Sequence, residues 1–114
     1  MSGLASYGAV QLRLADIDDA IAERQEPFET AARDYFTAKR DFERDFAIQH
    51  LKETGTVDER RHKTIVALWQ TESYKALVSA EANYEALKGV LRTFETRASI
   101  GQSLLKAMQR EVGG

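Results

Sequence analysis

The sequence predicts an all-α protein: a long, coiled-coil-like antiparallel helical hairpin with a kinked or separate N-terminal helix. Two observations predict this class. Only one of the 114 residues is Pro and seven are Gly, so few positions stop a helix. Apolar residues also recur at alternating spacings of three and four, which places them on one helix face and suits packing against a second helix. We expect one helical domain over residues 1–114 that self-associates.

The first arm of the predicted hairpin carries one such apolar stripe, in which Arg24 is the clear exception. Its members are Leu14, Ile17, Ile21, Arg24, Phe28, Ala31, Tyr35, Ala38 and Phe42. Pro27 lies inside this pattern, and proline removes a backbone donor and crowds the preceding turn. We therefore expect a kink or a break near residues 25–26, with Pro27 opening the second piece. This gives two helices, at about 9–24 and about 27–53.

The chain is predicted to reverse direction at Thr54-Gly55-Thr56. Gly55 can take the left-handed backbone conformation just beyond a helix end. Thr56 and Glu59 have the spacing of a capping box, in which both side chains satisfy free amide groups at a helix start. Because the connection is short, the next helix should run antiparallel to the first.

The second arm is predicted as one helix at about 57–111, because only Gly89 and Gly101 interrupt it. Its stripe consists of Leu77, Ala80, Tyr84, Leu87, Leu91, Phe94, Ala98, Gly101, Leu105, Met108 and Val112. A second apolar line lies beside this stripe, at Val66, Trp69, Ala76 and Val90. Because an apolar face this wide implies more than one packing neighbour, we expect the first arm to cover one line and another subunit the other.

The composition of the chain excludes several classes of function. The chain has no cysteine, which excludes disulfides and thiolate chemistry. It has 16 basic and 18 acidic residues, so it lacks the overall positive charge that is typical of nucleic-acid-binding proteins. No segment approaches the length of a membrane span and no secretory leader is evident; we expect a cytoplasmic protein. His62 has Asp58 four residues before it, but one such pair is too weak a signal for a helix-face metal site at His62 or at His50, and no catalytic constellation is present. We expect neither an enzyme nor a cofactor.

Positive charge nevertheless gathers around the predicted reversal. The candidate phosphate-binding residues are Lys39, Arg40, Arg44, Lys52, Arg60, Arg61 and Lys63. Six acidic residues share this window, so a solvated helix surface with local ion pairs explains the pattern equally well. Among the nearby aromatic residues, Phe36, Phe42 and Phe46 fall on or next to the stripe and are predicted to pack in the core. Trp69 is the exception, with the potential to stack on unpaired bases.

The order of these features resembles a known family. A broken N-terminal helix and a charged arm are followed by a short loop at residues 50–56 and a long helix reading YKALVSAEANYEALKGVLRTFETRASIGQSLLKAM. This pattern, over about residues 27–108, is similar to the UvsY-like phage recombination mediators. The likeness is one of pattern rather than of invariant motif, and this chain has a shorter loop and a slightly acidic overall charge.

The resemblance implies a homo-oligomer that binds single-stranded DNA and helps to load a RecA-like recombinase onto strands coated by single-strand-binding protein, in the host cytoplasm if the chain is phage-encoded. By topology, Arg44 and Lys52 match the DNA-contacting positions of the family, and Lys39-Arg40-Asp41-Phe42 is similar to its basic-basic-x-acidic-aromatic run. Arg60, Arg61 and Lys63 are added because they follow the turn. The alternative is a non-enzymatic coiled-coil scaffold or protein–protein adaptor, since heptads require no DNA.

Overall fold

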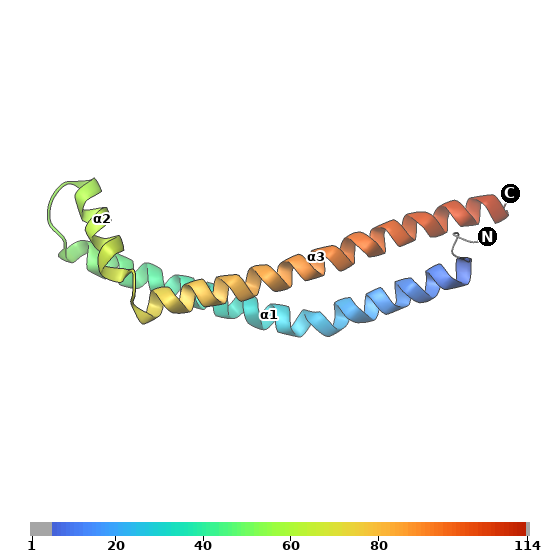
Figure 1. Ribbon diagram of the computed structural model, residues 1–114, viewed down its shortest axis with the longest axis horizontal. Helices are drawn as coiled ribbons and strands as arrows, with labels where there is room; N and C mark the ends of the chain where they lie inside the picture. The colour runs from blue at the N-terminus through green and yellow to red at the C-terminus, as the bar shows by residue number, and fades with distance from the viewer. Residues whose placement is uncertain (1–5, 114) are drawn as a thin grey trace. The chain divides into compact units, whose positions relative to one another are not determined.

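The computed structural model describes residues 6–113, and these residues form three helices and no strand. Helix α1 spans Tyr7–Lys52, α2 spans Val57–Leu68 and α3 spans Glu72–Gly113 (Figure 1). The predicted all-α class is confirmed. The chain divides into two compact units, which are called here the terminal unit (Met1–Phe28 and Leu87–Gly114) and the hairpin unit (Glu29–Ala86).

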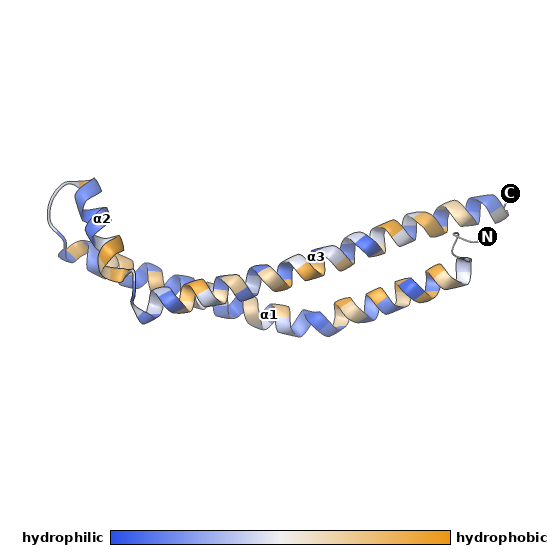
Figure 2. Cartoon of the chain, in the orientation of Figure 1, coloured by the Kyte–Doolittle hydropathy of each residue, from blue (hydrophilic) through white to orange (hydrophobic). Residues whose placement is uncertain are grey.

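In the terminal unit, the first half of α1 runs antiparallel to the second half of α3. Tyr7 accepts a hydrogen bond from Gln109 at 2.7 Å, and further along α1 the side chain of Leu14 lies against Gly101. Val10, Leu91 and Ala98 are buried in this contact. The stripe therefore forms the core of the unit, and polar residues alternate with it along both helices (Figure 2).

Arg24 interrupts the apolar stripe in sequence but joins the core in the structure. It is half-buried, its guanidinium carbon lies 4.7 Å from the centre of the Phe94 ring, and it donates to the carbonyl of Ala20 at 2.9 Å. Because an arginine can cover apolar surface with its stem and place its cation over a ring, this position is compatible with the stripe.

In the hairpin unit, α1 continues to Lys52, the chain reverses, and α2 and the start of α3 return along it. Ala31, Thr64 and Leu68 are its buried residues. Thr64 is completely buried, and its hydroxyl donates to the carbonyl of Arg60 at 2.7 Å, so burial leaves this polar group satisfied. Tyr35 of α1 stacks on Tyr84 of α3 with ring centres 5.1 Å apart, so the two helices are in contact at these positions.

Of the kink or break expected near residues 25–26, the break into two helices is wrong: α1 is one continuous helix with Pro27 inside it. Proline removes one amide donor and costs about 3 kcal/mol within a helix. Pro27 is exposed, whereas Phe28 is half-buried and Ala31 is 2% exposed. The stripe therefore continues past the proline with its face still packed, and this packing offsets the local cost.

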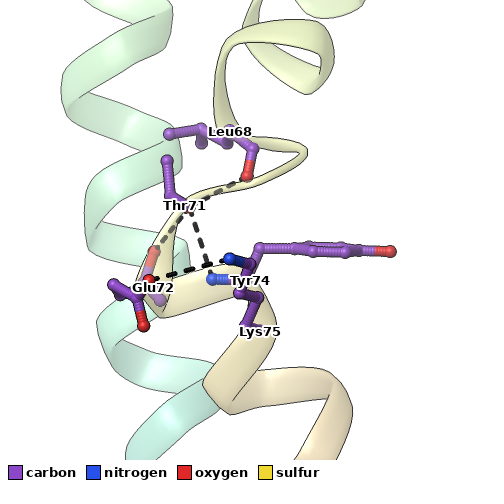
Figure 3. Close-up of polar contacts among 6 residues, drawn as sticks. Leu68, Thr71, Glu72, Tyr74 and Lys75 are labelled. Atoms are coloured by element: carbon purple, nitrogen blue, oxygen red, sulfur yellow. Dashed lines mark hydrogen bonds and ion pairs between the residues drawn. The ribbon is translucent and has the colours of Figure 1, made fainter.

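The prediction of one uninterrupted second arm is also wrong, because the chain turns at residues 69–71 between α2 and α3. The hydroxyl of Thr71 donates to the carbonyl of Leu68 at 2.8 Å and accepts from the amide of Tyr74 at 3.4 Å (Figure 3). The carbonyl of Thr71 accepts from the amide of Lys75 at 3.1 Å. Thr71 thus satisfies backbone groups at the end of α2 and caps the start of α3.

The reversal at residues 53–56 agrees with the prediction. Gly55 has a φ of 116°, and the hydroxyl of Thr56 accepts from the amide of Glu59 at 3.2 Å. The Glu59 side chain lies directly over Gly55. Gly55 and the Thr56 cap therefore end one helix and begin the next, as the residue types indicate.

Tyr35 provides a pH-dependent test of the hairpin unit. Burial raises the pKa of its phenol above the ordinary value of 10.0, and the nearby carboxylate of Glu81 raises this pKa further. Because the unfolded chain ionises at the lower pKa, the contribution of Tyr35 to stability is complete below pH 10.0 and falls as the pH rises above it. In an alkaline titration followed by tyrosinate absorbance, Tyr35→Phe should remove the phase that appears at the highest pH. If that last phase is unchanged, Tyr35 does not have the raised pKa described here.

Candidate nucleic-acid interface

All seven candidate cations lie in the hairpin unit, four on α1 and three on α2. Lys39, Arg40, Arg44 and Lys52 occupy the part of α1 that leads to the reversal, and Arg60, Arg61 and Lys63 occupy the first turns of α2. The turn at residues 53–56 joins the two groups. The surface formed by these residues is called here the basic end.

Arg40 and Arg44 are both exposed and lie four residues apart, so they share one outward face of α1. Arg44 is already matched with acids: its guanidinium nitrogens lie 3.9 Å from Asp41 and 3.9 Å from Asp45. Both ion pairs are solvent-exposed and weak. They nevertheless reduce the net charge that Arg44 can offer to a phosphate.

Arg60 and Lys63 are less available to a ligand than the other candidates. Arg60 is half-buried, and its Nε atom is enclosed without a hydrogen-bond partner among the described residues. The ammonium group of Lys63 donates to the carbonyl of Thr54 at 2.9 Å, which ties the start of α2 back to the turn. These two positions are therefore weaker candidates for DNA contact than the sequence indicated.

Five of the candidates remain exposed and without an ion pair among residues 6–113: Lys39, Arg40, Lys52, Arg61 and Lys63. Of these, Lys63 is the one whose ammonium group bonds to the turn. Lys52 is the last residue of α1, where a cation also complements the helix dipole. Arg61 lies on the first turns of α2. The cations of the basic end that are available to bind phosphates therefore lie both on α1, before the turn at residues 53–56, and on α2, after it.

Two of the three phenylalanines that were predicted to pack in the core do so. Phe42 is half-buried with its ring centre 5.8 Å from that of Tyr74, and Phe46 is half-buried and stacks on His50. The prediction is wrong for Phe36, which is 51% exposed, although its ring meets that of Tyr84 edge-on at 5.9 Å.

Trp69 is 56% exposed and stacks on Tyr74 with ring centres 5.3 Å apart. It lines an open cavity of about 410 Å³ together with Tyr74, Lys75 and Val78. An exposed ring beside a lysine is a combination suited to a base and its phosphate. Tyr74 and Lys75 were not identified as candidate site residues from the sequence. Thr71 could have indicated them, because it caps the start of α3 and both residues lie in the first turn of that helix.

The two histidines take part in local bonds near the reversal. His62 contacts the carbonyl of Asp58 through Nδ1 at 2.8 Å, and His50 lies 3.5 Å from the hydroxyl of Thr64. Within residues 6–113, no three metal-ligating side chains gather into a group that could hold an ion. The histidines are thus accounted for by contacts within the hairpin unit.

Comparison with protein-family models, with curated proteins and with solved structures found no match to this chain. In the part of the chain that the structure describes, no helix combines the length and apolarity that crossing a bilayer requires.

Proposed function

We propose that this protein is a non-enzymatic, self-associating helical protein that binds single-stranded DNA and acts as a recombination mediator, helping to load a RecA-like recombinase. The observation that carries the proposal is the basic end, where Lys39, Arg40, Lys52 and Arg61 are exposed without ion pairs among the described residues. Exposed lysine and arginine bind phosphates and release counterions from the strand. The similarity of residues 27–108 to UvsY-like mediators supports the same function.

Self-association would strengthen a site that is weak in one chain. The basic end also carries acidic residues, and its arginine at position 44 is partly neutralised by two of them. Repeating the basic end around an oligomer would present several copies to one strand, and linked weak contacts increase the overall affinity by orders of magnitude. The proposal therefore assigns DNA binding to the assembly.

The proposal is tested by fluorescence anisotropy with a labelled single-stranded oligonucleotide at two salt concentrations. We expect binding at low salt that weakens strongly as salt rises, because phosphate contacts dominate the affinity. A duplex of the same sequence serves as the comparison ligand. Absence of binding at low salt, or an affinity that ignores salt, would refute DNA binding at the basic end.

A second candidate function, a coiled-coil scaffold or adaptor, is favoured by the second apolar line. Val66 is 76% exposed, Trp69 is 56% exposed and Val90 is 41% exposed. Apolar side chains left uncovered along helices are typical of surfaces that pack against a partner. Sedimentation velocity with and without the oligonucleotide separates the two functions, because a scaffold would form the same species in both.

A further inference from the structure

The terminal unit contains a groove that the proposed DNA-binding surface does not use. It has a volume of about 250 Å³ and lies between α1 and α3. Its apolar lining includes Leu14 and Ile17 from α1 and Ile100 and Leu104 from α3. None of the seven candidate DNA contacts belongs to this unit, so the two surfaces can be tested separately.

Gly101 forms part of the groove because it brings the two helices close together. A Cβ atom at this position would lie 2.7 Å from Cδ2 of Leu14 and would clash with it, so the absence of a side chain at Gly101 lets Leu14 pack closely against α3. Beside it, Ile100 is 64% exposed and Leu104 is 45% exposed. The groove is therefore an open apolar surface that still has area to bury.

Each helix contributes one arginine to the lining of the groove: Arg13 on α1 and Arg97 on α3. Both are exposed, and neither forms an ion pair among the described residues. Arg97 makes only a distant contact with the Phe94 ring, at 5.9 Å. No carboxylate lines the groove, so its charge complements an acidic ligand.

The groove is short. On α3 it extends from Arg97 to Leu104, which is about 10 Å along a helix at 1.5 Å per residue. A full-length helix of a second copy would need a longer continuous apolar surface than this. The length and the two flanking arginines together favour a short segment with a few apolar side chains and nearby carboxylates.

We propose that the groove of the terminal unit binds a short acidic amphipathic peptide segment of another protein. The apolar side chains of the segment lie on Ile100 and Leu104, and its carboxylates accept hydrogen bonds from the guanidinium groups of Arg13 and Arg97. Arginine suits this role because its planar donors match a carboxylate. Charge determines which partner binds, and apolar contact holds it in place.

The test uses the full chain and a fluorescein-labelled synthetic peptide in which two adjacent leucines are flanked on both sides by glutamates. One control peptide replaces the glutamates with lysine, and another replaces the leucines with serine. We expect only the glutamate–leucine peptide to bind, and the double variant Arg13→Glu/Arg97→Glu to weaken it by at least about tenfold. The same double variant should gain affinity for the lysine peptide.

Two further variants make the result specific to the groove. Arg92→Glu changes the same charge at an exposed position of α3 that does not line the groove, and should leave the affinity within about twofold. Ile100→Ser should weaken binding while leaving the helical circular dichroism unchanged, because this side chain is largely exposed.

No binding by the unmodified chain, equal binding of the lysine peptide, or equal losses in Arg92→Glu and the double variant would overturn the proposal. Dissociation of a larger species by Ile100→Ser in sedimentation would also overturn it, by assigning the groove to a second copy.

Discussion

Leu91→Ala is expected to destabilise the terminal unit by about 2–5 kcal/mol, the range for removing a large aliphatic side chain from a packed core. Leu91 is 6% exposed and lies on the apolar stripe of α3. Truncation removes buried apolar surface and leaves a cavity between two helices that have few other buried residues. The free energy of unfolding is measured by urea denaturation followed by circular dichroism.

The matched control is Leu12→Ala, which makes the same chemical change in the same unit. Leu12 is 70% exposed and lies off the stripe of α1. We expect its effect to stay below about 0.5 kcal/mol, as for most surface substitutions. Equal effects of the two substitutions would contradict the antiparallel packing of α1 and α3 in the terminal unit.

Gly55→Ala is expected to destabilise the reversal in the hairpin unit by about 1–3 kcal/mol, the usual cost of a strained backbone conformation. Gly55 has a φ of 116°, a value that side-chain-bearing residues rarely adopt. The added methyl group would also meet the carboxylate of Glu59, which would have to move aside, so the backbone conformation accounts for most of the expected cost. Thermal unfolding measured by circular dichroism detects the change.

Gly89→Ala is the matched control and should change stability in the opposite direction. Gly89 lies inside α3, and a Cβ atom there would meet nothing within 4 Å. Because glycine in a helix interior costs about 0.5–1 kcal/mol relative to alanine, this substitution should be stabilising by that amount. A stabilising Gly55→Ala would contradict the backbone conformation of the turn.

The apolar stripe could be predicted from sequence because it repeats and because both arms carry it. All nine members from Leu14 to Phe42 are at least half-buried, and so are the described side chains of the second stripe from Leu77 to Met108. The side chain of Val112 lies outside the described part of the structure. Arg24 looked like an exception only because its residue type does not reveal that Phe94 lies beside it.

The helix boundaries that were wrong depend on packing or on weak local signals. Pro27 indicates a break by its own chemistry, but the stripe on both sides of it holds the helix together. Thr71 caps α3 through its hydroxyl, yet the residue three positions later is Tyr74 instead of the Glu or Gln of a capping box. Thr56 was recognised because Glu59 completes that pattern and Gly55 precedes it.

The sequence predicted which cations lie close together at the candidate site, but not which of them are available to bind a ligand. Sequence spacing placed seven cations near the reversal, whereas their availability depends on where each side chain turns. Lys63 bonds to a backbone carbonyl across the turn, and the Nε atom of Arg60 is enclosed in the hairpin unit. Neither outcome follows from residue type, because both depend on how α2 packs after the chain has reversed.

Binding of single-stranded DNA at the basic end is tested most directly by the salt dependence of the affinity. Each phosphate contact with a single strand contributes about 0.7 to the slope of log affinity against log salt. The triple variant Arg40→Gln/Lys52→Gln/Arg61→Gln removes three exposed cations from each chain and should lower the magnitude of the slope by about 2 for every chain of the assembly that contacts the strand.

The matched control, Arg92→Gln/Lys106→Gln/Arg110→Gln, removes the same charge from exposed positions on α3 in the terminal unit. The proposed function predicts that this control keeps the slope of the unmodified chain while the basic-end variant loses most of it. Equal slopes in the two triple variants, or a slope near zero in the unmodified chain, would contradict DNA binding at the basic end.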